Sequence, residues 1–283
     1  MRSPAVPSRS AGASGRVLAL LVALVVALGA AFVVAPGPLA AGASGGGFSD
    51  ERRLREAFRS AFVGYWSSGE QNFSPDLDRV VDYWFRYHVA KAVIAALLLM
   101  VLLALGVLLW KAFLSAGRLG GAGRAALASA GVVATMLAVF SLVLVMANVQ
   151  GAAAPFASLM PMLPGGPAHG HLADALDEVR QRLAAGERTP PALDVMISDF
   201  SWYHVVMAVI AASVSVVLIA MSVVSWKRFA ATGAADRRTR RVVGAFGVLS
   251  AVLSLVVIVV AVANTSTAAD PAPALSAFFE GGW

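Results

Sequence analysis

Five long apolar stretches dominate the pattern of hydrophobic and polar positions along the chain. They cover about residues 17–35, 89–110, 125–147, 205–225 and 242–263. A helix needs roughly 20 residues to cross a hydrocarbon core about 30 Å thick, so each stretch is long enough. The last four hold no ionisable residue except Lys91, near the start of its stretch. The pattern predicts an all-α integral membrane protein with the lipid bilayer as its first partner.

The first apolar stretch has the features of a secretory leader. Three arginines precede it, and Ala41-Gly42-Ala43 after it resembles the small-residue site at which signal peptides are cleaved. The apolar run is also long for a signal peptide. We therefore expect residues 1–43 to be either a signal peptide or an uncleaved signal-anchor helix.

An internal repeat organises the rest of the chain. The decapeptide YHVAKAVIAA from Tyr87 returns as YHVVMAVIAA from Tyr203, and a gapless alignment of residues 75–160 with 191–276 gives 30 identities in 86 positions. The matches include residues that low complexity does not supply, such as Pro75 with Pro191, Trp110 with Trp226, and Asn148 with Asn264. The alignment predicts an internal duplication. We assign residues 44–160 and 171–283 to the two repeat units and 161–170 to a Gly/Pro-rich linker.

Each repeat unit holds two apolar stretches, so both of its ends lie on one side of the membrane. The two units are then parallel rather than inverted copies. This predicts a four-helix transmembrane bundle made of two tandem helical hairpins, in addition to the leader.

Polar and aromatic residues mark the ends of the predicted spans. His88 and Trp110 are 22 residues apart, about 33 Å of helix, which is one membrane thickness. Asn148 and Asn264 fall where the second span of each unit returns to the depth of the histidine. We therefore expect two outer-layer polar pairs, His88 with Asn148 and His204 with Asn264.

Two amphipathic stretches precede the hairpins and predict short extracytoplasmic helices. Apolar residues recur every three or four positions over residues 54–66 and 172–183. We expect the helix that begins at Pro75 to continue through Arg86 into the membrane. In the tail, Phe278, Phe279 and Trp283 suit a membrane interface.

The distribution of charge predicts the orientation. The leader and the two turns inside the hairpins hold twelve basic residues and one acid, Asp236, whereas the other polar segments hold ten basic and fifteen acidic residues. By the positive-inside rule the leader and turns are cytoplasmic and the carboxyl terminus is extracytoplasmic. The basic excess is thus a topology signal, and we expect no nucleic-acid partner. The alanine-rich, lysine-poor composition is typical of GC-rich bacteria, which predicts a bacterial plasma membrane.

Candidate chemistry is sparse. The chain has no cysteine, which excludes disulfides and thiolate sites. All four histidines, His88, His169, His171 and His204, fall on the predicted outer side and are candidates for binding copper or zinc, and His88 and His204 are candidates for haem ligation. No nucleophile-elbow or HExxH pattern is present. We expect no catalytic residues, no resident cofactor and no enzyme activity.

The leading functional hypothesis is a non-enzymatic accessory, scaffold or sensor component that presents its outer helices to another membrane or envelope protein. The spans lack the mid-membrane charges that coupled transporters need. The alternatives are a small-molecule channel or carrier, for which the serines of the spans would line a path, and a metal- or haem-binding module built on the outer histidines.

Overall fold

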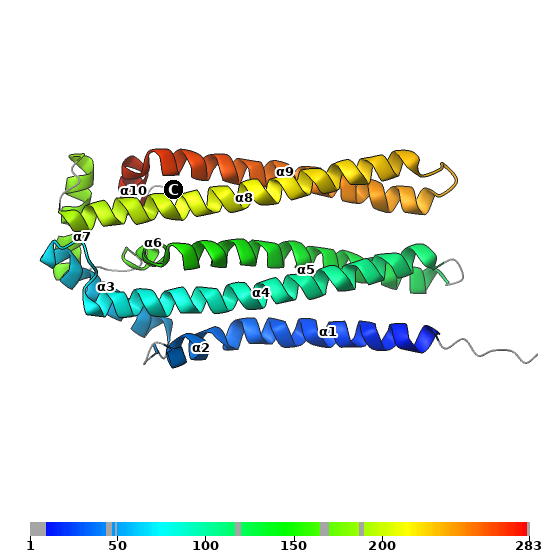
Figure 1. Cartoon of the computed structure of the whole chain (residues 1–283), viewed down its shortest axis with the longest axis horizontal. Coiled ribbons are helices and arrows are strands. Elements are labelled where there is room, and N and C mark those ends of the chain that lie inside the picture. Colours follow the sequence, from blue (N-terminus) through cyan, green and yellow to red (C-terminus); the bar gives the residue numbers. More distant parts are fainter. Residues whose placement is uncertain are drawn as a thin grey trace, which may run out of the picture. The chain divides into compact units, whose positions relative to one another are not determined.

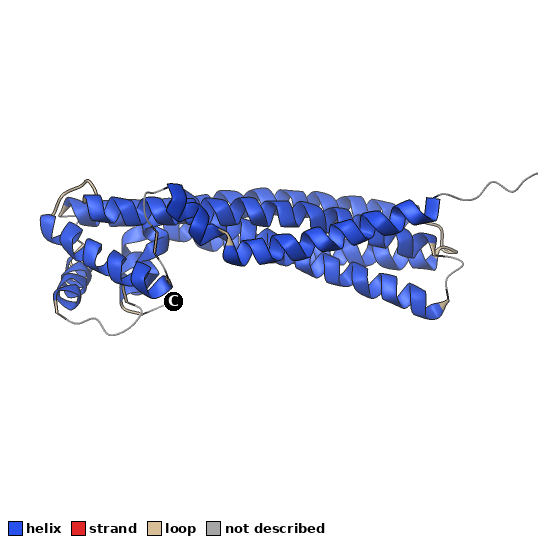
Figure 2. Cartoon of the chain, turned by 90° about the horizontal axis from the view of Figure 1, so that it is seen from below, coloured by secondary structure: helices blue, strands red, loops and turns tan. Residues whose placement is uncertain are grey.

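The computed structural model describes residues 10–43, 47–48, 50–116, 120–164, 170–186 and 190–281. The regular structure of these residues is helical, without strands (Figures 1 and 2). Five helices are long and apolar enough to span a membrane, as the five apolar stretches predicted. The elements are α1 (Ser10–Val34), α2 (Pro36–Ala43), α3 (Glu51–Ser68), α4 (Pro75–Ser115), α5 (Gly121–Ala153), α6 (Pro155–Leu159), the short 3-10 helix η1 (Met160–Met162), α7 (His171–Ala184), α8 (Pro191–Ala231), α9 (Arg237–Ala269) and α10 (Pro271–Phe279).

Contacts divide the chain into two compact units. The first combines Met1–Ala35 with Lys91–Val145, and the second combines Pro36–Ala90 with Met146–Trp283. Helices α4 and α5 contribute to both, because each runs across a boundary between them. The repeat units 44–160 and 171–283 were assigned from sequence similarity, whereas these two units are defined by contacts. The assignment of the repeat units therefore stays a prediction.

In the first unit, α1 packs on the pair formed by α4 and α5. Leu105 and Leu109 of α4 and Ala134 of α5 form a small buried cluster, against which α1 places Leu18, Leu21 and Val25. The Lys91 ammonium lies 4.8 Å from the centre of the Phe32 ring of α1. Between α4 and α5, the buried Ser141 Oγ donates to Ala95 O at 2.9 Å.

In the second unit, α8 and α9 run side by side over their length, joined by a short turn (Figure 1). At the other end of this pair lies a group of short helices that we call the head. It consists of α2, α3, α6, η1, α7 and α10 with the adjoining ends of α4, α5, α8 and α9. As expected, α4 continues without a break from Pro75 through Arg86 into its apolar part.

The long helices of the two predicted repeats have matching bounds. Helices α4 and α8 each have 41 residues, and α5 and α9 each have 33. Helix α8 begins and ends 116 positions after α4, and α9 begins and ends 116 positions after α5. The breaks after them match too, since Ala154 has φ −135° and ψ 70° and Asp270 has φ −135° and ψ 73°. Both precede a proline, which disfavours a helical conformation at the residue before it and lacks the N–H that would continue the helix.

The head has one continuous core of apolar and aromatic side chains. Phe58, Phe62 and Tyr65 of α3 and Phe156 of α6 are almost completely buried in it. Phe58 and Phe156 meet edge to face with their ring centres 6.3 Å apart. Fully burying a side chain of this kind contributes roughly 1.5–3 kcal/mol. The apolar stripes of α3 and α7 face this core, as their spacing predicted.

The tail differs from its expected place. Leu275, Phe278 and Phe279 of α10 are buried in the head core rather than lying at a membrane interface, and Trp283 lies outside the described residues. Arg180 of α7 holds this end, because its Nε donates to Phe279 O at 3.0 Å. The sequence did not distinguish the two places, because an apolar helix face can be buried against protein or against lipid.

Candidate functional site

Two histidine–asparagine pairs lie where the head joins the long helices. His88 Nδ1 of α4 is 3.0 Å from Asn148 Oδ1 of α5. His204 Nδ1 of α8 is 2.8 Å from Asn264 Oδ1 of α9. Each bond connects two helices that are consecutive long elements of the chain. The structure therefore brings the members of each predicted polar pair together.

A neighbouring carbonyl orients the second pair. Asn264 Nδ2 donates to Val260 O at 2.9 Å, so Asn264 Oδ1 is the atom that faces the imidazole. An amide oxygen only accepts hydrogen bonds, so the neutral His204 ring carries its proton on Nδ1. The Nε2 atom is then the acceptor nitrogen of this ring.

The His88 ring is enclosed by aromatic groups and by a glycine. The Trp84 ring meets the imidazole ring edge to face, with ring centres 4.7 Å apart. Gly151 of α5 lies against Cε1, Nδ1 and Nε2 of the same imidazole. Trp84 is held in turn, because its Nε1 donates to Ser158 Oγ of α6 at 2.8 Å. The Tyr87 ring stacks on Trp84 at 5.1 Å.

Three hydrogen bonds tie the start of α8 to the end of α5 and to α6. They join Asp199 Oδ2 to Ala157 N at 2.7 Å, Trp202 Nε1 to Ala153 O at 3.1 Å, and Gln150 Nε2 to Tyr203 O at 3.1 Å. The Asp199 carboxylate thus accepts from the first turn of α6, where amide groups have no partner inside their own helix. These bonds connect the two predicted repeats within the head.

On the far side of the head, α3 and α7 are joined by a charged hydrogen bond. Trp66 Nε1 donates to Glu178 Oε2 at 2.8 Å. This bond, followed by those from Arg182, lowers the pKa of the Glu178 carboxyl. The ionised carboxylate is therefore the form that the folded head favours.

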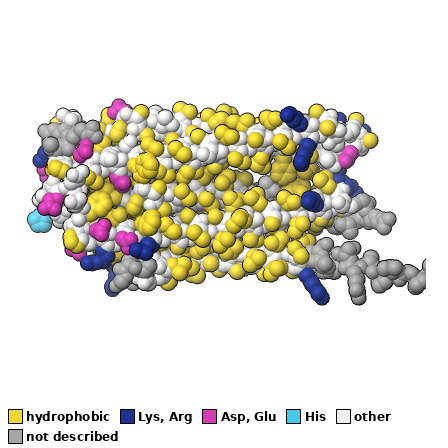
Figure 3. Space-filling model, in the orientation of Figure 1, with side chains coloured by type: hydrophobic (Ala, Val, Ile, Leu, Met, Phe, Trp, Pro, Cys, Tyr) yellow, Lys and Arg dark blue, Asp and Glu magenta, His cyan; other side chains and the backbone are white. Residues whose placement is uncertain are grey.

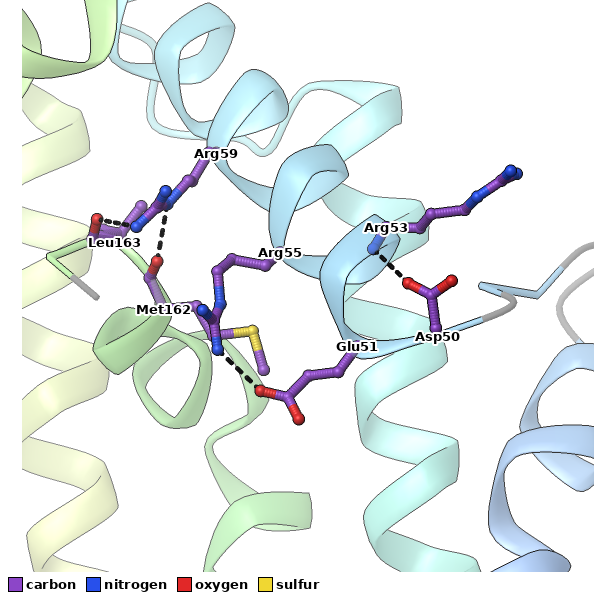
Figure 4. Close-up of polar contacts among 7 residues, drawn as sticks. All are labelled: Asp50, Glu51, Arg53, Arg55, Arg59, Met162 and Leu163. Atoms are coloured by element: carbon purple, nitrogen blue, oxygen red, sulfur yellow. Dashed lines mark hydrogen bonds and ion pairs between the residues drawn. The ribbon is translucent and has the colours of Figure 1, made fainter. Parts of the chain in front are cut away.

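Arg59 of α3 binds the end of η1 (Figure 4). Its Nε donates to Met162 O at 2.9 Å and its Nη2 donates to Leu163 O at 3.0 Å. Burial, and then the nearby Arg55 charge, lower the pKa of the Arg59 guanidinium. The two bonds satisfy carbonyl groups that the short helix leaves without partners.

Sequence reasoning missed Arg59, Glu178 and Asp199 as bonding residues. Their partners lie 103, 112 and 42 positions away along the chain. Helical periodicity reveals which face a residue occupies but not which distant group it meets. The one usable signal was the place of Arg59 beside the apolar stripe of α3.

The candidate metal ligands are not assembled into a site in the part of the chain that the structure describes. His171 is exposed at the start of α7, and His169 lies outside the described residues. The Nδ1 atoms of His88 and His204 face asparagine oxygens. Among the described residues, no three His, Cys, Asp or Glu side chains gather closely enough to hold an ion.

An open groove of about 670 Å³ lies between α3 and the start of α4. Small residues of α3, such as Ser60 and Gly64, line one side of it. The charged side chains among its lining residues are Asp76 and Arg79, which pair with each other at 3.4 Å. The lining includes no histidine or lysine that would activate Ser60 or Ser74 as a nucleophile.

Within the long helices, buried serines bond to backbone carbonyls. Ser215 Oγ donates to Ala211 O within α8, and Ser222 Oγ donates across to Gly247 O of α9. Ser254 Oγ bonds to Ala251 O in its own helix. These hydroxyls act as packing groups for the helices.

No protein-family model, curated protein or solved structure matches this chain. The functional argument therefore rests on the geometry above.

Proposed function

We propose that this chain is a multi-pass protein of a bacterial plasma membrane, built from two tandem copies of a membrane-crossing helical hairpin. Its leader and the two hairpin turns are cytoplasmic, and its head and carboxyl terminus are extracytoplasmic. The equal lengths of α4 and α8 and of α5 and α9, and the two equivalent His–Asn bonds, support the duplication. The basic turns support the orientation.

The function we propose is non-enzymatic: a scaffold or sensor component that presents its head to another membrane or envelope protein. The observation that carries this proposal is the construction of the head. Its aromatic core and its hydrogen bonds between distant segments hold α3 and α7 in one arrangement, while charged residues of the same helices face outward. The side chains of Arg52 and Glu56 are 81% and 67% exposed.

The spans support this function better than a channel or carrier. The hydroxyls of Ser141, Ser215, Ser222 and Ser254 bond to helix carbonyls. Many apolar residues of the spans face outward, as lipid contact requires. A carrier needs groups that exchange these bonds for bonds to a solute. No observation favours the metal or haem alternative.

Site-specific photo-crosslinking in the native host tests the proposed function. A photoreactive residue at position 52, 56 or 177 reports on the head, and one at Val209 or Val216 on the exposed apolar face of α8. We expect head positions to give a discrete adduct heavier than the chain, identified by mass spectrometry as one envelope protein. Adducts from the α8 positions alone, or none from the head, would contradict the proposal.

A further inference from the structure

The turn between α8 and α9 carries an unusual concentration of positive charge. Residues 227–241 hold six basic side chains and one acid, Asp236. Lys227, Arg228, Arg237 and Arg241 are exposed to solvent. Along α8 and α9, at the top of Figure 3, hydrophobic side chains cover the length of the pair and dark-blue side chains appear at the turn end. The basic residues therefore lie where the apolar surface ends.

The other hairpin provides an internal comparison. Its turn has the same length, because α4 and α5 have the same bounds as α8 and α9 shifted by 116 positions. Residues 111–125 nevertheless hold three basic residues and no acid. Arg228, Arg238 and Arg241 correspond there to Ala112, Ala122 and Ala125. Since the first turn needs only three positive charges for its orientation, the topology rule does not explain the additional arginines of the second.

Helix stability does not explain them either. The start of α9 is already capped, because Asp236 Oδ1 accepts from Thr239 N at 3.1 Å. Positive side chains in a first helical turn face the positive end of the helix dipole, which destabilises the helix. Arg237, Arg238 and Arg240 also repel one another, and the attraction between Asp236 and Arg238 offsets this only in part. An arrangement that opposes local stability implies an external negative partner.

Aromatic contacts hold part of this cluster at the end of the apolar surface. The Arg240 guanidinium lies 4.5 Å from the centre of the Phe229 ring, and the Trp226 ring meets Phe229 edge to face at 5.6 Å. Gly244 lies close to the Phe229 ring, since a Cβ at residue 244 would be 3.2 Å from it. Tryptophan and arginine in this combination are typical of the boundary between hydrocarbon and headgroups.

We propose that the α8–α9 turn binds the headgroups of anionic phospholipids in the leaflet that it faces. The phosphodiester oxygens accept hydrogen bonds from guanidinium groups, and the negative surface of the leaflet attracts the remaining charge. On the orientation proposed above, this is the cytoplasmic leaflet. The turn of the first hairpin lacks the additional arginines and binds such lipids more weakly.

Lipid titration of the purified full-length protein, followed by native mass spectrometry, tests this site. The probes are phosphatidylglycerol and the zwitterionic phosphatidylcholine. We expect phosphatidylglycerol to bind at least tenfold more tightly, with an affinity that falls as salt is added. Since each basic residue near an anionic surface contributes roughly fivefold, Arg228→Ala, Arg238→Ala and Arg241→Ala together should weaken phosphatidylglycerol binding at least tenfold.

Two matched variants separate the site from net charge and from folding. Arg52→Ala, Arg53→Ala and Arg79→Ala remove three charges from the head and should keep wild-type affinity. Arg228→Lys, Arg238→Lys and Arg241→Lys keep the charge of the turn and should retain most of the binding. Equal affinity for the two lipids, or equal losses in the turn and head variants, would overturn the proposal. So would displacement of phosphatidylglycerol by inorganic phosphate at constant ionic strength. The measurement involves no protein partner, so its outcome is independent of the proposed scaffold function.

Discussion

Gly151 of α5 lies directly against the imidazole ring of His88. A Cβ at residue 151 would be 2.7 Å from His88 Cε1 and 2.8 Å from Nδ1, closer than van der Waals contact allows. The absence of a side chain at residue 151 is therefore what lets His88 reach Asn148.

Replacing this glycine should disturb the first His–Asn pair. We expect Gly151→Ala to lower the free energy of unfolding by about 1–3 kcal/mol, because the ring must move and overpacking costs this much. The measurement is unfolding of the detergent-solubilised protein followed by circular dichroism. Gly106→Ala in α4 is the control, since no atom lies within 4 Å of its added Cβ. It should stabilise the helix slightly. Equal effects of the two substitutions would contradict the role of Gly151.

The second His–Asn pair should be energetically coupled. Asn264→Leu should cost about 1–3 kcal/mol, because the half-buried His204 N–H loses its acceptor. His204→Leu combined with Asn264→Leu should cost less than the sum of the single changes, by about 0.5–3 kcal/mol. Thr265→Val, which removes only a bond within α9, is the matched control and should change stability by less than about 0.5 kcal/mol. Additive single and double effects would show that the pair contributes nothing as a pair.

Glu178 should make the head less stable in acid. Its pKa is lower in the folded protein than the ordinary value of 4.5, so the ionised carboxylate favours the folded state. This contribution is complete above the unfolded pKa and is lost as the pH falls through the folded pKa. It should amount to at most about 1 kcal/mol, since the side chain is 45% exposed and water screens it.

Glu178→Gln provides the measurement. The wild-type protein should have a higher thermal midpoint than this variant at neutral pH, and the difference should disappear as the pH falls through the lowered pKa of the folded Glu178 carboxyl. Glu56→Gln is the control, because Glu56 and Arg52 are both exposed and 3.9 Å apart. This substitution should leave the thermal midpoint at neutral pH unchanged. A difference for Glu178→Gln that persists in acid would contradict the assignment.

The leader should remain on the mature protein. Ala40 of α2 is completely buried in the head core, and α1 contributes Leu18, Leu21 and Val25 to the cluster around Leu105. Residues Ala41 to Ala43 are helical, whereas a protease needs an extended segment. Intact-mass measurement and amino-terminal sequencing of the protein from its host membrane should find residues 17–43 still attached. A mature chain that begins immediately after Ala43 would contradict this.

Sequence patterns predicted the long helices well because their cause is local. Each span needs about 20 apolar residues, and a proline at the first helical position, Pro75 or Pro191, marks where α4 and α8 begin. Spacing also placed each histidine at the depth of its asparagine, although it did not decide whether the two side chains touch. Length and spacing thus give the depth of a residue, and the hydrogen bonds of the two pairs come from the packing of the helices.

The arrangement of the head could not be predicted in the same way. Its bonds join α3 to η1 and α7, and α10 to α7, across segments about 100 residues apart. The apolar face of α10 was equally compatible with lipid and with a protein core. The close approach of Gly151 to His88 had no signal either, because the corresponding residue of the second repeat is Thr267.

The central claim is that the α8–α9 hairpin and its counterpart cross the membrane, with the head on one side and both turns on the other. Single-cysteine labelling tests it most directly, because the chain has no cysteine of its own. Asp177→Cys reports on the head, Gly121→Cys on the first turn and Ala235→Cys on the second, and all three positions are exposed. With a membrane-impermeant maleimide on spheroplasts, residue 177 should react at once and residues 121 and 235 only after the membrane is permeabilised. Labelling of residue 177 and either turn from the same side would contradict the account.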